Sequence, residues 1–172
     1  ILAHTPKVRC SIPPMRRPAL RYNHPNAECS KSSHVGHHKT SYFAAAGFQY
    51  VELAAVRGWT EHVSSDMTEE QIDEVKKKLT SLGLNAIGMS GHCNLMEEER
   101  LDDFRRNIVL ASKLGCKYII SSTGEAHFGE GESFSDEVLA KHLKSLVPDL
   151  KKYGITMVLE VHGEYGTGEA LY

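Results

Sequence analysis

A repeated helix, glycine and strand unit constrains the fold more than any other feature of this chain. Four glycines each follow a helical segment and precede a β-favouring one: Gly47, Gly83, Gly115 and Gly154. They are spaced 36, 32 and 39 residues apart. Glycine commonly ends a helix in the left-handed conformation, and strands joined through a helix pair in parallel. The repeat therefore predicts four parallel strands connected by three helical crossovers.

The predicted strands span residues 48–53, 84–89, 117–120 and 155–162, and a helix is expected to end in residues 42–46. Residues 57–62, around the only tryptophan, are predicted to form a polar loop. Parallel strands of this kind are normally covered on both faces, which suits their mostly apolar content. The chain is 41% hydrophobic over 172 residues, enough to build one good core.

The helix before the second strand has the clearest signals. Thr68 and Gln71 form a capping box at its start, and the glycine at 83 stops it. Its predicted core stripe consists of Ile72, Val75, Leu79 and Leu82. A second stripe consists of Leu101, Phe104, Ile108, Ala111 and Leu114. A third helix, capped by Ser135 and kinked at Pro148, has a predicted stripe of Val138, Leu139, Leu143, Leu146, Leu150 and Tyr153.

Two architectures fit this order of elements, a doubly wound sheet and a TIM barrel. No strand is followed by the GxGxxG pattern of a dinucleotide-binding sheet. Polar residues gather instead at or just beyond the predicted strand ends: Glu52, His92, Glu125, Glu160 and His162. Barrel enzymes place their chemistry at the carboxyl ends of the strands. We therefore expect an α/β fold that is part of a (β/α)8 TIM barrel.

The pair Glu160 and His162 is the strongest candidate site within this pattern. Residues two apart in a strand point to the same face, so the carboxylate and the imidazole share one end of a buried strand. Burying either group without a partner is costly, so such a pair usually meets a metal, a substrate or a counter-charge. The alternative is a glutamate that bonds to a neighbouring loop beside an exposed histidine.

Residues 1–41 differ from the remainder in composition. They carry seven Lys or Arg against one acid, five of the six prolines and five of the ten histidines. No helical or strand period is visible, so we expect an irregular or disordered basic arm joined to an acidic body at 42–172. Its arginines lack the interleaved aromatics of nucleic-acid binders, so we expect no nucleic-acid partner. Its candidate zinc ligands match no standard spacing: Cys29, His34, His37 and His38.

The sequence indicates a cytoplasmic protein. No apolar run reaches the 18 or more residues of a membrane span, and nothing resembles a secretory signal. The four cysteines form no CxxC pair and no regular framework: Cys10, Cys29, Cys93 and Cys116. This usage suits reduced thiols in the cytosol better than a disulfide scaffold.

Four short motifs occur in order at this spacing, in residues 47–53, 90–95, 122–125 and 159–163. With them, residues 42–172 resemble the N-terminal half of the sugar phosphate isomerase/epimerase family, which has a xylose isomerase-like TIM barrel. The resemblance implies a small sugar or polyol substrate and a divalent metal, Mn, Mg, Co or Zn. It also implies proton transfer next to a carbonyl through an ene-diolate that the metal stabilises.

The same resemblance assigns roles to the five polar residues. Glu160 matches the fifth-strand metal ligand, which can also act as an acid or base. Glu52 and His92 match positions that line the substrate site, while Glu125 and His162 would bind substrate or orient the metal ligands. From the residues alone, Glu52 and Glu125 could equally anchor loops, and His92 could be a loop histidine satisfied by its neighbours.

The chain also departs from the family pattern. The first strand is not recognisable, and the last three strands, with three expected metal ligands, are absent. An open half barrel would expose strand edges and apolar surface, which favours homo-oligomers. The expected function is therefore metal-assisted isomerisation or epimerisation as part of a longer protein. The alternatives are an inosose-type dehydratase of the same superfamily, an apurinic endonuclease or an inactive half-barrel fragment.

Overall fold

A computed structural model describes residues 39–123 and 135–160 of the chain. Its elements are α1 (Lys39–Ala45), β1 (Tyr50–Val56), β2 (Thr60–Glu61), α2 (Glu69–Ser81), β3 (Asn85–Ser90), α3 (Arg100–Lys113), β4 (Tyr118–Ser122), α4 (Asp136–Tyr153) and β5 (Thr156–Glu160). Strands and helices alternate from β1 to β5, except for the short β2. The four predicted strands and the helices between them are confirmed.

The strands of the described residues form one sheet in the order β2, β1, β3, β4, β5. The pairs β1 with β3, β3 with β4 and β4 with β5 are parallel, as the helical crossovers require. The carboxyl ends of these four strands therefore lie along one edge of the sheet.

The predicted polar loop at 57–62 was wrong in part. Thr60 and Glu61 form β2, which pairs antiparallel with the end of β1 through Val56 and Ala55. The His62 ring nitrogen Nδ1 also accepts a hydrogen bond from the Ala54 backbone N–H, at 3.1 Å. This pairing extends β1 to Val56, three residues beyond its predicted end.

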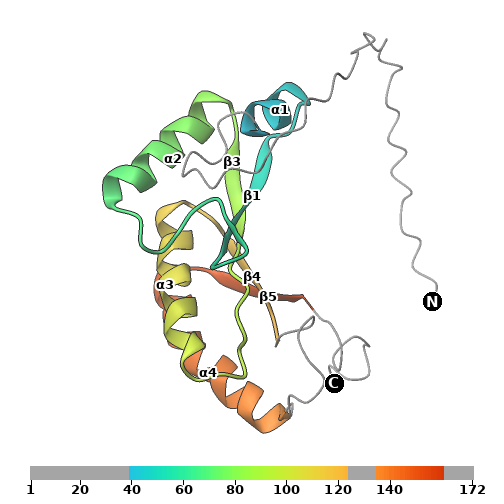
Figure 1. The fold of residues 1–172 in the computed structure, drawn as a ribbon, viewed down its shortest axis with the longest axis vertical. Coiled ribbons are helices and arrows are strands. Elements are labelled where there is room, and N and C mark those ends of the chain that lie inside the picture. Colours follow the sequence, from blue (N-terminus) through green and yellow to red (C-terminus); the bar gives the residue numbers. More distant parts are fainter. Residues whose placement is uncertain (1–38, 124–134, 161–172) are drawn as a thin grey trace, which may run out of the picture. The chain divides into compact units, whose positions relative to one another are not determined.

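Helices α2, α3 and α4 cover the same face of the sheet (Figure 1). The apolar cluster between these layers includes the fully buried side chains Leu84, Met89, Leu95, Phe104, Ile108, Ile119 and Leu146. The predicted stripes supply most of the helical part of this core. The prediction that Val138 faces the core was wrong, because its exposed fraction is 36%. His142 is buried in its place, one helical turn before Leu146.

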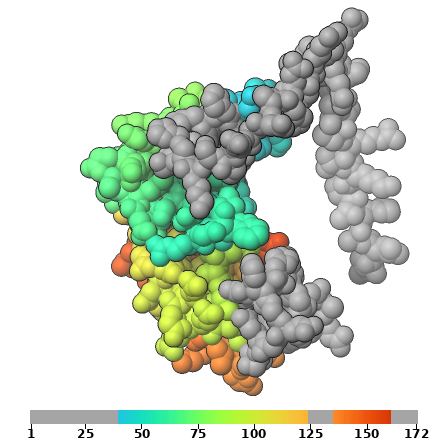
Figure 2. Space-filling view, in the orientation of Figure 1, coloured from blue at the N-terminus to red at the C-terminus, as the bar shows by residue number. Residues whose placement is uncertain are grey.

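Helices α3 and α4 lie side by side, as the space-filling view shows for their yellow and orange atoms (Figure 2). At this contact Arg105 donates to the Asp149 carboxylate at 3.3 Å and to Ser145 Oγ at 3.2 Å. The Gly154 residue that ends α4 has φ of 66°, a left-handed conformation that costs glycine little. It turns the chain from α4 directly into β5.

The face of the sheet that points away from the helices carries exposed apolar side chains. Tyr118 and Val158 are each 41% exposed, and the register with alternating side chains places them on the same face. Tyr50 on β1 is 57% exposed. A closed barrel would enclose such a face in its interior. Self-association through it stays a prediction.

The described ranges contain no helix long and apolar enough to cross a membrane. Residues 1–38 of the predicted arm, with its candidate zinc ligands, lie outside the described residues. Residues 39–41, predicted to be irregular, form the start of α1. The division into an arm at 1–41 and a barrel body at 42–172 therefore remains a proposal.

The capping box predicted at α2 is formed in full, and it supplies the first stability test. The Gln71 backbone N–H donates to Thr68 Oγ1 at 3.3 Å, and the Thr68 N–H donates to the Gln71 side chain at 2.9 Å. We expect Thr68→Ala to lower the free energy of unfolding by ~1 kcal/mol in urea titrations. Thr80→Ala, on the exposed surface of the same helix, should cause no loss. Equal effects of the two substitutions would contradict the cap assignment.

Candidate functional site

The parallel register brings His92 and Glu160 together across three strands. Ser90 at the end of β3 is paired with Ile120 of β4, and Ser122 at the end of β4 is paired with Glu160. His92, two residues after Ser90, therefore lies level with the last residues of β4 and β5. Its Nε2 is 3.1 Å from Oε2 of Glu160. A pair separated by 68 residues in sequence is joined only because these strand ends share one edge.

Ser90 completes this contact on the other side of the ring. Its Oγ lies 2.7 Å from Nδ1 of His92. Gly91, between them, keeps the strand pairing by donating its N–H to the Ile120 carbonyl at 2.9 Å. A Cβ at Gly91 would lie 3.3 Å from both Asn107 Nδ2 and Ile119 Cδ1, so this position faces α3. Ser90 and His92, one residue to either side, point to the opposite face.

The contact between His92 and Glu160 is partly open to solvent. The side chain of His92 is 27% exposed and that of Glu160 is 53% exposed. Ion pairs with this much solvent access stabilise a fold by ~1 kcal/mol or less. The pair therefore contributes little to the stability of the fold.

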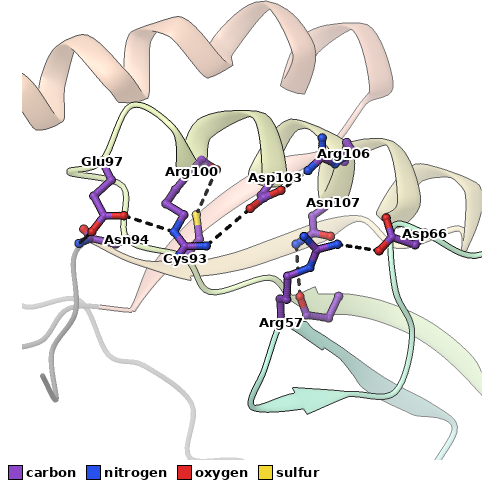
Figure 3. A network of polar contacts seen from close by, with 10 residues as sticks. Arg57, Asp66, Cys93, Asn94, Glu97, Arg100, Asp103, Arg106 and Asn107 are labelled. Atoms are coloured by element: carbon purple, nitrogen blue, oxygen red, sulfur yellow. Dashed lines mark hydrogen bonds and ion pairs between the residues drawn. The ribbon is translucent and has the colours of Figure 1, made fainter. Parts of the chain in front are cut away.

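The loop after β3 is anchored by buried polar groups (Figure 3). Buried Asn94 donates from Nδ2 to Glu97 at 3.2 Å, and its Oδ1 accepts from the Met96 N–H at 3.1 Å. The Leu95 carbonyl accepts a hydrogen bond from Nδ1 of His142, which is buried on α4, at 2.8 Å. These contacts hold the backbone that carries His92. His142 was not predicted from the sequence, although its spacing three residues after Leu139 fits the buried stripe.

Cys93 is adjacent to His92 but faces another environment. Its Sγ contacts the Arg100 carbonyl (Figure 3), at a distance of 3.9 Å, and its N–H points to Ser121 Oγ at 3.5 Å. Burial, with a smaller effect from the Asp103 carboxylate, raises the pKa of the Cys93 thiol to about 12. The thiol therefore stays neutral near pH 7, where neither nucleophilic attack nor metal ligation by a thiolate is favoured.

A small polar pocket lies at the end of β1, apart from this contact. It is lined by Ala55, Arg57, Glu61, Ser64, Ser65, Asp103 and Asn107. Arg57 pairs with Asp66 at 2.6 Å, and buried Asn107 donates to the Ala55 carbonyl at 3.3 Å (Figure 3). Of the predicted site residues that the structure describes, Glu52, His92 and Glu160, none lines this pocket.

The predicted position of Glu52 was wrong. It was predicted near the C-terminal end of its strand, but it is the third of seven residues in β1, because pairing with β2 continues the strand to Val56. Its side chain is exposed, and its neighbour Leu53 is buried toward the helices. Glu125 and His162 fall outside the described residues. Of the five predicted site residues, the structure thus joins His92 with Glu160, and the roles of all five stay predictions.

The candidate site supplies only part of the ligand set that a divalent cation needs. The Glu160 carboxylate is a suitable oxygen ligand, and carboxylates that bind metals are commonly held by hydrogen bonds such as the one from His92. Residues 39–123 and 135–160 contain no group of three histidine, cysteine, aspartate or glutamate side chains that could hold a metal ion. The described part of the chain therefore supplies one suitable ligand for a cation, Glu160, and does not complete a cation site.

The alternation of parallel strands and helices, with polar groups at the carboxyl ends, defines an α/β fold of the partial TIM-barrel type. The family described as "Xylose isomerase-like TIM barrel" matches residues 41–170. This match covers most of the chain, so the chain belongs to that family. No curated protein sequence matches the chain significantly.

Solved structures show the same fold at low sequence identity. A xylose isomerase-like TIM barrel protein from Mycobacterium smegmatis in complex with magnesium is 17% identical, with a TM-score of 0.62 over 77% of this chain and 49% of that chain. A D-psicose 3-epimerase solved with D-fructose is 15% identical, with a TM-score of 0.60 over 74% and 47%. An IOLI protein with bound zinc is 16% identical, with a TM-score of 0.56 over 76% and 49%. The chain thus spans about half the length of these barrels.

The protonation of Cys93 gives a direct test of its environment. Iodoacetamide reacts with the thiolate, so a pKa of about 12 predicts labelling of Cys93 in the folded chain at pH 8.5 that is at least ~100-fold slower than for free cysteine. Mass spectrometry of digests would follow each cysteine separately. Unfolding in urea should restore the ordinary rate. Labelling of folded Cys93 at the free rate would contradict its burial beside the loop after β3.

Proposed function

We propose that this chain contributes the fifth-strand carboxylate of a metal-dependent sugar isomerase or epimerase, with Glu160 as the ligand and His92 as its orienting partner. The reaction class is proton transfer at the carbon next to a carbonyl. The substrate is a small sugar or sugar phosphate. The complete site takes in further groups beyond those described.

The contact of His92 Nε2 with Glu160 Oε2 carries this proposal. It joins an imidazole and a carboxylate at the carboxyl ends of two parallel strands, where barrel enzymes hold their reacting groups. A carboxylate held in one orientation by a neighbouring histidine is suited to bind a cation or to move a proton. An ion pair as exposed as this one stabilises a fold only weakly. Stabilisation of the fold therefore does not explain why the pair lies at the strand ends.

Each residue of the candidate site would have a separate role in this reaction. Glu160 holds a cation through its carboxylate or exchanges a proton with the substrate carbon. His92 keeps that carboxylate in place by donating from Nε2. The buried anchors of the loop after β3, Asn94 and His142, keep His92 level with Glu160. A bound divalent ion supplies polarisation of the substrate carbonyl.

The named relatives support the sugar assignment by analogy of fold. The solved barrels include a D-psicose 3-epimerase and an L-ribulose 3-epimerase, the latter 17% identical with a TM-score of 0.50. Magnesium and zinc are bound in two further matches. Sequence identity of 15–17% is evidence for a shared fold and not for a shared substrate. The choice of sugar and of metal therefore rests on experiment.

Isotope exchange tests the proposed reaction without requiring a known product. The chain is incubated with D-fructose and Mn²⁺ in D₂O, and deuterium at the carbon next to the ketone is followed by NMR. Removal of that proton and its return from solvent must introduce deuterium. We expect Glu160→Gln to slow this exchange by at least ~100-fold, because general acid–base groups and cation ligands contribute on that scale.

Glu74→Gln provides the matched control, because Glu74 is exposed on α2 and far in sequence from the site. It should exchange deuterium like the wild-type chain. Absence of exchange in the wild-type chain, or exchange that Glu160→Gln leaves unchanged, would contradict the proposal.

A further inference from the structure

Ser90 makes a contact that the strand pairing does not require. Its backbone lies in register with Ala54 of β1 and Ile120 of β4, so the ladder holds its main chain whatever its side chain. The hydroxyl is part-buried and lies 2.7 Å from Nδ1 of His92, a short distance for such a bond. The side chain of Ser90 is therefore directed at His92, whose other ring nitrogen contacts Glu160.

The histidine ring has two orientations related by a half-turn about its Cβ–Cγ bond. Rotation exchanges Nδ1 with Cδ2 and Nε2 with Cε1, and the torsion itself favours neither strongly. In the observed orientation, Ser90 meets Nδ1 and Glu160 meets Nε2. In the rotated ring both would meet carbon atoms, and both hydrogen bonds would be lost. The two partners thus select the same orientation.

The direction of the hydrogen bonds follows from the chemistry of the groups. A carboxylate only accepts, so the imidazole donates to Glu160 from Nε2. In the neutral ring the other nitrogen is then an acceptor, and the Ser90 hydroxyl is the donor that fits it. A hydroxyl can supply that proton, whereas an alanine in its place cannot.

We propose that Ser90 is a positioning residue, whose hydroxyl holds the His92 ring in the orientation that presents Nε2–H to Glu160. This inference deepens the proposed function and rests on it, since it concerns the same carboxylate. Ser90 does not touch the substrate or the cation in this account. It acts through His92 and determines how well the carboxylate is held.

Three variants of the chain test this role. Ser90→Ala removes the hydroxyl, Ser90→Thr keeps it on a residue that suits a strand, and Ser81→Ala makes the same deletion at the end of α2. The imidazole nitrogens are observed by ¹⁵N NMR in chain labelled at histidine, and His92→Gln identifies the His92 signals. Mn²⁺ affinity is measured by calorimetry on the same samples.

We expect Ser90→Ala to shift the Nδ1 resonance of His92 toward that of a nitrogen without a donor, and to broaden its Nε2–H signal. Mn²⁺ affinity should fall ~10-fold, the lower end of the range for residues that orient a metal ligand. Ser90→Thr should restore the signals and the affinity, and Ser81→Ala should change neither. Wild-type signals and affinity in Ser90→Ala, or a failure of Ser90→Thr to restore them, would overturn the role.

The two readouts separate this inference from the proposed function. The ring orientation is measured without any metal, so the NMR comparison decides the role of Ser90 in every case. If the wild-type chain binds no Mn²⁺, the proposed function is contradicted. If it binds Mn²⁺ and the NMR signals of Ser90→Ala are those of the wild type, the positioning role alone is contradicted.

Discussion

The parallel pairing of β3, β4 and β5 is the constraint on which the site depends. Each strand adds its carboxyl end to the same edge, and the register sets Ser122 level with Glu160 and Ser90 level with Ile120. A shift of one residue would turn every side chain to the opposite face. His92 and Glu160 meet because no such shift occurs. The chemistry proposed for this chain is thus a consequence of strand register.

Burial on one face of the sheet fixes that register. Met89 and Ile119 are fully buried against the helices, and they are directly paired in neighbouring strands. Slipping either strand would expose apolar area that stabilises the fold by ~25 cal/mol per Å² when buried. The opposite face carries exposed Tyr118 and Val158 together with the site residues. One face of the sheet therefore specifies the structure, and the other carries the candidate site residues His92 and Glu160.

Local signals in the sequence predicted the helices well, while pairing between distant segments limited the prediction of the strands. The Thr68 cap and the glycine stops depend on a few neighbouring residues, so they could be read directly. The end of β1 depends on pairing with β2, which the polar segment around Trp59 did not indicate. The position of Glu52 was misjudged for this reason. Ser90 could have been found, because the two-residue spacing that linked Glu160 with His162 also links Ser90 with His92.

Anomalous diffraction from crystals of the chain grown with Mn²⁺ would test the central claim most directly, that the shared strand edge is the site of a cation-dependent enzyme. The account predicts an anomalous peak at bonding distance from a Glu160 carboxylate oxygen, with His92 Nε2 still hydrogen-bonded to that carboxylate. Mn²⁺ favours such oxygen ligands. A peak only elsewhere on the chain, or no ordered Mn²⁺ beside Glu160, would contradict it.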